Sequence, residues 1–367
     1  MKTALVYNPE IKKYSFGKDH PFTSERFENF LNFLKKNLPN FKDYFEEILP
    51  EPAKEEDLKL FHAPEYIEAM KKASRGIILS NIFQYTTIDN LDPLTGYLPR
   101  GIEEATRIAV GTSLTATKLV FGGKFKKAIA IGGGLHHAKR DFGEGFCIYN
   151  DVVICAKKLL QKGLKKILIL DTDAHAGNGT AEAFYEDDRV LLIDLHQDPR
   201  TIYPGTGFIE EIGRGIGEGF TINLPLLPGA GEMAYQYCFD KIISPLSKEF
   251  KPEIIIRNGG SDPYYRDGLT NLGLTLNGFL MIGEKVRKIA KEVCQGKEID
   301  LLASGYNTEV LPYAWSALIA GLLDLEIDLT SLKEPNPPAK GAKYNEIKDM
   351  VRELEKYLKK YWKCFNS

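Results

Sequence analysis

Four short apolar runs in the chain each lead directly into a glycine-rich segment that carries His, Asp or Tyr. The runs cover residues 128–131, 167–170, 254–256 and 301–303. Apolar runs of this length, without polar alternation, are typical of strands that are buried on both faces of a parallel sheet. Because parallel strands all point in one direction, the segments that follow them meet at one edge of the sheet. The sequence therefore predicts one polar site at that edge.

The remaining pattern also favours an α/β fold, with a single open, mostly parallel sheet and helices on both faces. Further strands are expected at 3–7, 190–195 and 220–224. Residues 76–100 show no regular pattern and are expected to form surface loops. Helical spacing of apolar residues predicts helices around 27–34, 55–75, 102–121, 151–162, 180–186, 231–249, 275–294 and 312–324.

The proline-rich segment 334–341 predicts a linker near the end of the chain. We therefore expect a main domain over 1–330, followed over 331–367 by the linker and a C-terminal amphipathic helix packed on that domain. The helix is basic in part, but its interleaved acidic residues disfavour a nucleic-acid-binding arm. Its apolar stripe consists of Tyr344, Ile347, Val351, Leu354, Leu358 and Tyr361.

Composition restricts the classes of protein further. With 367 residues, 43% of them hydrophobic, the chain can bury a large core, and its net charge of -2 gives no basic field for direct nucleic-acid binding. Five widely spaced cysteines without a CxxC motif are expected to be reduced thiols. No apolar run predicts a membrane span or a signal peptide, so a cytoplasmic location is expected. The oligomeric state is not indicated.

Carboxylates and a histidine follow two of the four runs. On an extended segment Asp171, Asp173 and His175 share one face, so Asp173 and His175 can reach one ion. Asp262 follows another strand and can supply a third ligand. Three protein ligands leave a coordination position for water, as in catalytic sites. Helix capping is the alternative role for such acids, but the dense Asp-x-Asp-x-His cluster favours a metal ion.

Adjacent histidines and one tyrosine follow the other two runs. His136 and His137 come after three glycines, and histidine exchanges protons near neutral pH. Tyr306 follows Gly305 and can donate a hydrogen bond to an oxyanion. The alternatives are packed histidines and a packed tyrosine. His20 and His62 are expected to be structural.

Ten motifs in a fixed order, between about residue 15 and residue 325, resemble the histone deacetylase family of the arginase/deacetylase superfamily. Acetylpolyamine amidohydrolases and acetoin-utilisation proteins share this framework. The motifs are His20-Pro21 with Arg26, Phe61-His62 with Tyr66-Ile67, Gly-Gly-Gly-Leu-His136-His137, Gly145-Phe146-Cys147, residues 171–179, Phe184-Tyr185, Leu195-His196, Tyr203-Pro204-Gly205, Asp262-Pro263 with Gly268-Leu269, and Gly305-Tyr306.

The resemblance implies a role for each matching position. Residues 1–330 would form the catalytic domain of a deacetylase. The implied zinc ligands are Asp173, His175 and Asp262, a donor set that is also acceptable to Fe²⁺. The implied proton-transfer pair is His136, supported by Asp171, and His137, supported by Asn178, while Tyr306 would polarise the acetyl carbonyl. The implied acyl-lysine channel is lined by Gly145, Phe146, Tyr203 and Leu269. The implied structural K⁺ or Na⁺ site includes Asp171 and Asp194.

Two departures from the family pattern concern the site itself. Ala303 and Ser304 replace two glycines before Gly305-Tyr306, which is expected to shift the tyrosine loop. Ala176 replaces the second histidine of a common His-His-Gly sequence, and we expect this change to be tolerated. The arginase branch needs extra carboxylates for a second metal, and Gly177 and Tyr264 occupy those positions, so a ureohydrolase is rejected.

The function that the resemblance implies is hydrolysis of an acetylated amine by metal-activated water. The substrate would be N-acetyl-lysine in a protein or an acetylated small-molecule amine. An acetylpolyamine amidohydrolase is the alternative within the same class. A non-catalytic acyl-lysine binding module is the alternative from another class, and it is disfavoured because the ligands, both histidines and the tyrosine are all present.

Overall fold

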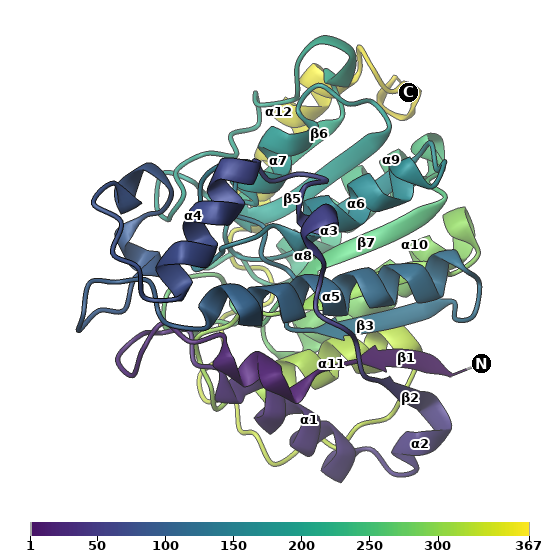
Figure 1. Ribbon diagram of the computed structural model, residues 1–367. Helices are drawn as coiled ribbons and strands as arrows, with labels where there is room; N and C mark the ends of the chain where they lie inside the picture. The colour runs from purple at the N-terminus through teal and green to yellow at the C-terminus, as the bar shows by residue number, and fades with distance from the viewer. Residues whose placement is uncertain (1, 367) are drawn as a thin grey trace.

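The computed structural model describes residues 2–366, and its centre is one eight-stranded sheet in which every pairing is parallel (Figure 1). The expected open α/β sheet is therefore confirmed, and it is fully rather than mostly parallel. The strands are β1 (Thr3–Val6), β2 (Phe45–Ile48), β3 (Lys127–Ile131), β4 (Ile167–Asp171), β5 (Val190–Gln197), β6 (Thr221–Leu226), β7 (Ile254–Gly259) and β8 (Glu298–Leu302).

The strand order across the sheet is β2-β1-β3-β8-β7-β4-β5-β6. The four apolar runs of the sequence thus become β3, β8, β7 and β4, which are neighbours at the centre of the sheet. Almost every residue of these strands is buried, because helices cover both faces. The order places the segments after these four strands side by side.

Two layers of helices enclose the sheet, with α5 and α6 in front of it and α10 and α11 behind it in the view of Figure 1. The short helix α2 (Phe41–Tyr44) lies beside the edge strand β2. The front layer contains α3 (Glu55–Leu58), α4 (Pro64–Ser74), α5 (Ile102–Phe121), α6 (Asp151–Gln161) and α7 (Asn178–Phe184). The back layer contains α1 (Glu25–Asn37), α8 (Glu232–Cys238), α9 (Ser244–Phe250), α10 (Leu276–Cys294), α11 (Leu311–Leu323) and α12 (Tyr344–Leu358).

The structure differs from the expected elements in two places. Strand β2 has no counterpart among the expected strands, because Phe45-Glu46-Glu47-Ile48 is an edge strand with a charged outer face and no long apolar run. The expected helix at 231–249 is divided into α8 and α9 by the π-helical turn Phe239–Ile243. Residues 76–100 are irregular as expected, with only two short 3₁₀ turns.

Helix α12 packs against α8 and buries Ile347, Val351, Leu354 and Leu358. Beyond it, the indole of Trp362 donates a 2.7 Å hydrogen bond to the Gly219 carbonyl. The amphipathic pattern of this segment therefore serves packing, since its apolar face is covered. All five cysteines are free thiols. Within residues 2–366, no helix is both long enough and apolar enough to span a membrane.

A buried ion pair joins two of the central strands. Arg257 of β7 and Asp300 of β8 are register partners, and the guanidinium donates two hydrogen bonds to the carboxylate, at 2.8 and 2.5 Å. A third nitrogen of Arg257 donates to the Thr172 hydroxyl at 2.9 Å. Because Thr172 lies directly after β4, this pair connects the interior of the sheet with the segment that carries Asp173.

Candidate active site

The segments after the four central strands bring the predicted site residues together at one edge of the sheet. His136 and His137 follow β3, and Asp173 and His175 follow β4. Asp262 follows β7 and Tyr306 follows β8. In Figure 1 this edge faces left, beside the irregular blue loops next to α4. The parallel topology therefore brings together residues that are up to 170 positions apart in sequence.

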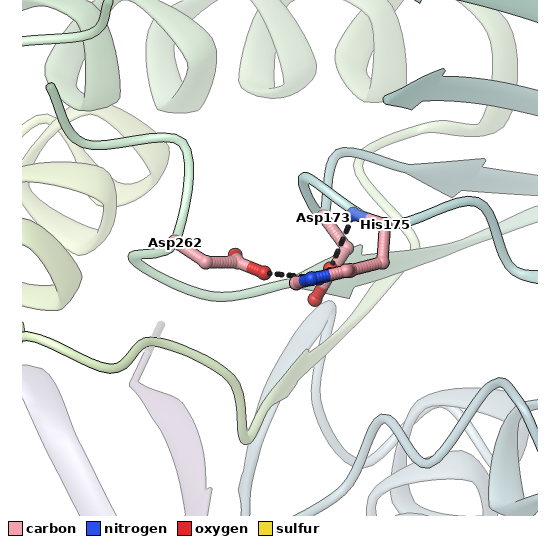
Figure 2. A group of neighbouring side chains, drawn as sticks. All are labelled: Asp173, His175 and Asp262. Carbon is pink, nitrogen blue, oxygen red and sulfur yellow. Dashed lines mark hydrogen bonds and ion pairs between the residues drawn. The ribbon is translucent and has the colours of Figure 1, made fainter. Parts of the chain in front are cut away.

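The central group consists of Asp173, His175 and Asp262, whose potential ligand atoms all lie within 4.8 Å of one another. Nδ1 of His175 lies 3.1 Å from Oδ1 of Asp173 and 3.1 Å from Oδ2 of Asp262, so the imidazole bridges the two carboxylates (Figure 2). All three side chains are buried. Within residues 2–366 this is the one such group of His, Cys, Asp and Glu side chains.

The charges of this group indicate a position for a cation. Burial acts to lower the pKa of His175, but Asp173 and Asp262 outweigh it and raise the pKa to about 10. Burial also raises the pKa of Asp262, and the nearby Asp173 carboxylate raises it further. Two buried carboxylates that share a proton with an imidazole can exchange that proton for a metal ion.

Ser304 supports this group, although sequence reasoning assigned it no role. Its hydroxyl donates a 3.1 Å hydrogen bond to Oδ1 of Asp262. Ser304 is one of the two departures from the glycine pattern before Tyr306. The substitution therefore adds a hydrogen bond to one of the predicted metal ligands.

The first histidine of the pair contacts a carboxylate directly. Nδ1 of His136 lies 2.8 Å from Oδ2 of Asp171, and both side chains are buried. Burial acts to lower the pKa of His136, but Asp171 and Asp173 outweigh it and raise the pKa to about 9. A second donor, the amide of Asn258, lies 2.9 Å from the same oxygen of Asp171.

The second histidine contacts an amide. Nδ1 of His137 lies 2.8 Å from Oδ1 of Asn178, and the other end of that amide donates a 2.7 Å hydrogen bond to Glu144. Burial lowers the pKa of His137 well below its usual value, and the neighbouring His136 and His175 lower it further. The two adjacent histidines, whose ring centroids lie 4.1 Å apart, therefore have opposite electrostatic environments.

The backbone on both sides of the histidine pair is held by residues at the start of α6. The Asp151 carboxylate accepts hydrogen bonds from the backbone N–H groups of Gly134 and Leu135, at 2.7–3.1 Å. The Asn150 amide donates to the carbonyls of His136 and Ala138, at 3.0 and 3.1 Å. These contacts fix the glycine-rich loop, whose own sequence favours flexibility.

The Tyr306 ring lies edge-on to the His175 ring of the central group. Its ring centroid is 6.2 Å from that of His175 and 5.9 Å from that of Phe146. Its backbone N–H donates a 2.7 Å hydrogen bond to Asp267. Burial raises the pKa of the Tyr306 hydroxyl, and the Asp262 carboxylate raises it further, so the hydroxyl stays protonated. Gly305, at φ +125°, provides the turn before it.

The expected channel residues are only partly brought together. The ring of Phe146 contacts that of Tyr306, and the ring of Tyr203 contacts that of His137 at 5.0 Å. Gly145 packs so closely that a Cβ atom there would lie 2.4 Å from the His137 ring. Leu269 is 42% exposed on the loop after Asp262, and its neighbour Gly268 lies beside Tyr306.

The residues of the expected monovalent-cation site are register partners on adjacent strands. Asp171 of β4 pairs with Asp194 of β5. Oδ1 of Asp194 lies 2.7 Å from Nδ1 of His196, and its Oδ2 accepts a 2.8 Å hydrogen bond from the Gly177 N–H. Burial raises the pKa of Asp194, the His196 ring opposes that shift, and the Asp171 carboxylate adds to it.

Sequence reasoning assigned no role to several residues that hold the site, among them Glu144, Asp151, Asn258 and Ser304. Asn258 had a usable signal, because it is a polar residue at the end of an apolar run. Glu144 stands between two glycines, next to a motif whose implied role is substrate binding. Asp151 had no distinguishing signal, since acidic residues at helix starts are common. Ser304 was marked only as a departure from the family's glycine pattern.

Comparison with known proteins places this arrangement in a family. The histone deacetylase domain matches residues 20–322. The chain belongs to the histone deacetylase family. It is 35% identical over 374 residues to a "Probable deacetylase" of Archaeoglobus fulgidus, with 100% of both chains covered. It is 36% identical over 327 residues to the acetoin utilization protein AcuC of Staphylococcus aureus, a match that covers 89% of this chain and 83% of that protein.

A solved structure has the same overall fold as this chain. The crystal structure of the HDA15 HD domain superimposes with a TM-score of 0.84 at 25% sequence identity, covering 100% of this chain and 98% of that one. Family membership and the relative named a probable deacetylase support a hydrolytic deacetylase activity for this chain. The match to the family ends at residue 322, before α12 begins.

Proposed function

We propose that this member of the histone deacetylase family is a zinc-dependent deacetylase that hydrolyses the amide of an acetylated amine, N-acetyl-lysine or a similar linear amine. The observation that carries the proposal is the buried group of Asp173, His175 and Asp262, with both histidines and Tyr306 around it. Family membership and the probable deacetylase among its relatives support the same reaction class.

The donor set fits a divalent ion. One imidazole and two carboxylates suit Zn²⁺ and are also acceptable to Fe²⁺. The raised pKa of His175 supports this assignment, because positive charge already occupies the space between the two carboxylates. An ion held by these three residues would polarise the amide carbonyl and acidify a water molecule.

The histidines would divide the proton transfers between them. His137 is neutral, because burial lowers its pKa, so it can accept the proton of the attacking water. His136 has a raised pKa and can remain charged next to the tetrahedral intermediate. Tyr306, kept protonated by its buried position, can donate a hydrogen bond to the developing oxyanion.

The substrate would enter along aromatic rings. Phe146 lies against Tyr306, and Tyr203 lies against His137, so two rings border the approach to the central group. Such walls suit the methylene chain of a linear acylamine, with about 0.8 kcal/mol gained for each buried methylene. Gly145 and Leu269 complete the channel in this proposal. We also retain a K⁺ or Na⁺ ion beside Asp171 and Asp194.

A binuclear ureohydrolase site is not favoured. Position 177 is a glycine, and Tyr264 is a buried side chain packed against Tyr265. Neither residue can supply a carboxylate to a second ion. A non-catalytic binding module is not favoured either, because every group that the reaction needs is present.

The test follows the hydrolysis products after the protein is stripped of metal and reloaded with Zn²⁺ or Fe²⁺: acetate from acetylated amines, the corresponding acid from longer acyl-lysines, and urea from arginine. Substrates are an acetyl-lysine peptide, acetylpolyamines, longer acyl-lysines and arginine. We expect turnover of at least one acetylated amine, and loss of both metal and activity in Asp262→Asn. The control Asp188→Asn makes the same chemical change at an exposed position and should keep both. Urea release from arginine, without turnover of any acetylated amine, would overturn the proposal.

A further inference from the structure

A carboxylate is connected to His137 through an intervening amide. Nδ1 of His137 lies 2.8 Å from Oδ1 of Asn178, and Nδ2 of Asn178 donates a 2.7 Å hydrogen bond to Oε1 of Glu144. The same Glu144 oxygen lies 3.1 Å from Nζ of Lys139. Glu144 is only 9% exposed, whereas Asn178 is half-buried and the Lys139 side chain is 33% exposed.

The chemistry of these groups determines which one donates and which one accepts each hydrogen bond. An ionised carboxylate only accepts hydrogen bonds, so Glu144 requires the NH₂ group of Asn178 to face it. The amide oxygen must then face His137. Because this oxygen only accepts, Nδ1 of His137 must carry the ring proton. A neutral imidazole has one N–H group, so its Nε2 is left with a free lone pair.

The reverse amide orientation is disfavoured while Glu144 is a carboxylate. It would place the Asn178 oxygen against a Glu144 oxygen, with two acceptors facing each other and no proton between them. It would also place the NH₂ group against Nδ1 of His137 and move the ring proton to Nε2. A base needs its lone pair on the nitrogen that faces the reacting water. The amide orientation therefore decides which ring nitrogen can act.

From this geometry we propose that Glu144 is a positioning residue that fixes the orientation of the Asn178 amide and, through it, the Nδ1–H tautomer of His137. The proposal rests on the proposed function, in which His137 accepts the water proton. Asp171 contacts His136 directly, at 2.8 Å, whereas the carboxylate on the His137 side is one amide further away. Glu144 therefore selects the tautomer without placing a full negative charge in contact with the ring.

The turn around Glu144 is held independently of its side chain. The Gly145 N–H donates a 2.7 Å hydrogen bond to Asp89, and the Glu144 carbonyl accepts a 3.0 Å hydrogen bond from the Cys147 N–H. Gly145 has φ +60°, which favours glycine, and packs against the His137 ring. Replacing Glu144 by the isosteric glutamine should therefore leave the fold intact.

Three variants test the proposal through activity. Glu144→Gln replaces a carboxylate, which can only accept hydrogen bonds, with an amide that can also donate them. The Asn178 amide can then adopt both orientations. We expect kcat to fall about tenfold, the loss typical when a residue that supports a functional side chain is removed. Asn178→Asp alone places two carboxylates against each other and should also lower kcat. The double variant Glu144→Gln/Asn178→Asp restores a fixed direction of hydrogen bonding. The new carboxylate at position 178 can only accept hydrogen bonds, and it accepts them from Nδ1 of His137 and from the new amide at position 144. Its kcat should exceed that of both single variants.

The matched control is Glu182→Gln, which makes the same change at an exposed position of α7. It should retain the wild-type kcat. Thermal melting curves of Glu144→Gln, the double variant and the control should be close to that of the wild type, because the backbone contacts of the turn are unchanged and no like charges face each other. A purely structural role of Glu144 does not predict that Asn178→Asp rescues Glu144→Gln.

A second measurement does not depend on activity. The protein has six histidines, and ¹⁵N chemical shifts of the imidazole nitrogens in the metal-free protein report each tautomer, with His137 assigned through His137→Ala. We expect the Nδ1–H form in the wild type, a mixture in Glu144→Gln, and the Nδ1–H form again in the double variant. Unchanged shifts in Glu144→Gln, or a double variant no better than the singles, would overturn the proposal. Absence of any deacetylation, with the tautomer pattern as expected, would instead remove only the proposed function.

Discussion

Asn258 and His136 approach the same carboxylate oxygen: the Asn258 amide donates to Oδ2 of Asp171 at 2.9 Å, and Nδ1 of His136 lies 2.8 Å from it. Asn258 is the register partner of Asp171 on the neighbouring strand β7. The sheet itself therefore orients the carboxylate that supports the first histidine. This relationship links the packing of the central strands to the chemistry at their ends.

Removal of the Asn258 amide should weaken both stability and activity. Asn258→Ala leaves a buried Asp171 oxygen with one partner fewer, which should cost about 1–3 kcal/mol of unfolding free energy. The freed carboxylate should also lower kcat by about tenfold. Urea denaturation and acetate release measure the two effects. The control Asn271→Ala makes the same change at an exposed residue and should alter the unfolding free energy by less than about 0.5 kcal/mol. Equal stability of the two variants would contradict the role of Asn258.

Loss of the Asp171 charge should lower the pKa of His136. In the metal-free protein this pKa is about 9, because Asp171 and Asp173 outweigh burial. Removing a negative neighbour disfavours the imidazolium form, so Asp171→Asn should lower the pKa by about 1–3 pH units. An NMR titration of the His136 ring measures this shift, with Asp188→Asn as the exposed control. A pKa that stays near 9 would show that Asp173 alone sustains it.

Metal binding should strengthen as the pH rises. The pKa of His175 is about 10 in the metal-free protein, so at neutral pH the ring holds a proton that must leave before it can act as a ligand. For one released proton, the apparent Kd for Zn²⁺ should fall about tenfold per pH unit between about pH 6.5 and pH 9. Calorimetry in buffers of different ionisation enthalpy counts the released protons, and a pH-independent Kd would contradict this expectation.

The same raised pKa has the opposite effect on the metal-free fold. A group whose pKa rises from 6.5 to about 10 on folding contributes stability that is fully present below pH 6.5 and is lost as the pH rises through 10. The metal-free protein should therefore lose stability over this interval faster than the zinc-loaded protein. Denaturation curves at several pH values, with and without zinc, measure the difference.

The buried pair of Arg257 and Asp300 should respond differently to single and double substitution. Arg257→Met leaves the Asp300 carboxylate buried without its partner and should cost about 3–5 kcal/mol of unfolding free energy. Arg257→Met/Asp300→Leu removes both charges and should recover most of that loss, because the cost of desolvating both ions is removed as well. Urea denaturation of both variants decides the point, and a double variant as unstable as the single one would contradict it.

The sequence by itself determined the fold class and identified the residues whose side chains can take part in catalysis or metal binding. Apolar runs without alternation identified the strands that are buried on both faces, since only a covered parallel sheet accommodates them. The glycine-rich segments after these runs identified the six residues of the site by their place along the chain: His136, His137, Asp173, His175, Asp262 and Tyr306. The strand β2 escaped this reasoning, because an edge strand has one exposed face and needs no apolar run.

Only the tertiary structure decided how these residues are connected. The sequence does not state that β8 and β7 lie between β3 and β4, and that order places Asn258 beside Asp171 and Ser304 beside Asp262. The contact of Glu144 with Asn178 likewise joins a loop residue to the first residue of α7, 34 positions further along the chain. Hydrophobic periodicity and composition predict whether a residue of a helix or strand is buried or exposed. Which residue of another element it contacts depends on the strand order and on the paths of the loops. These arise from packing of the whole chain.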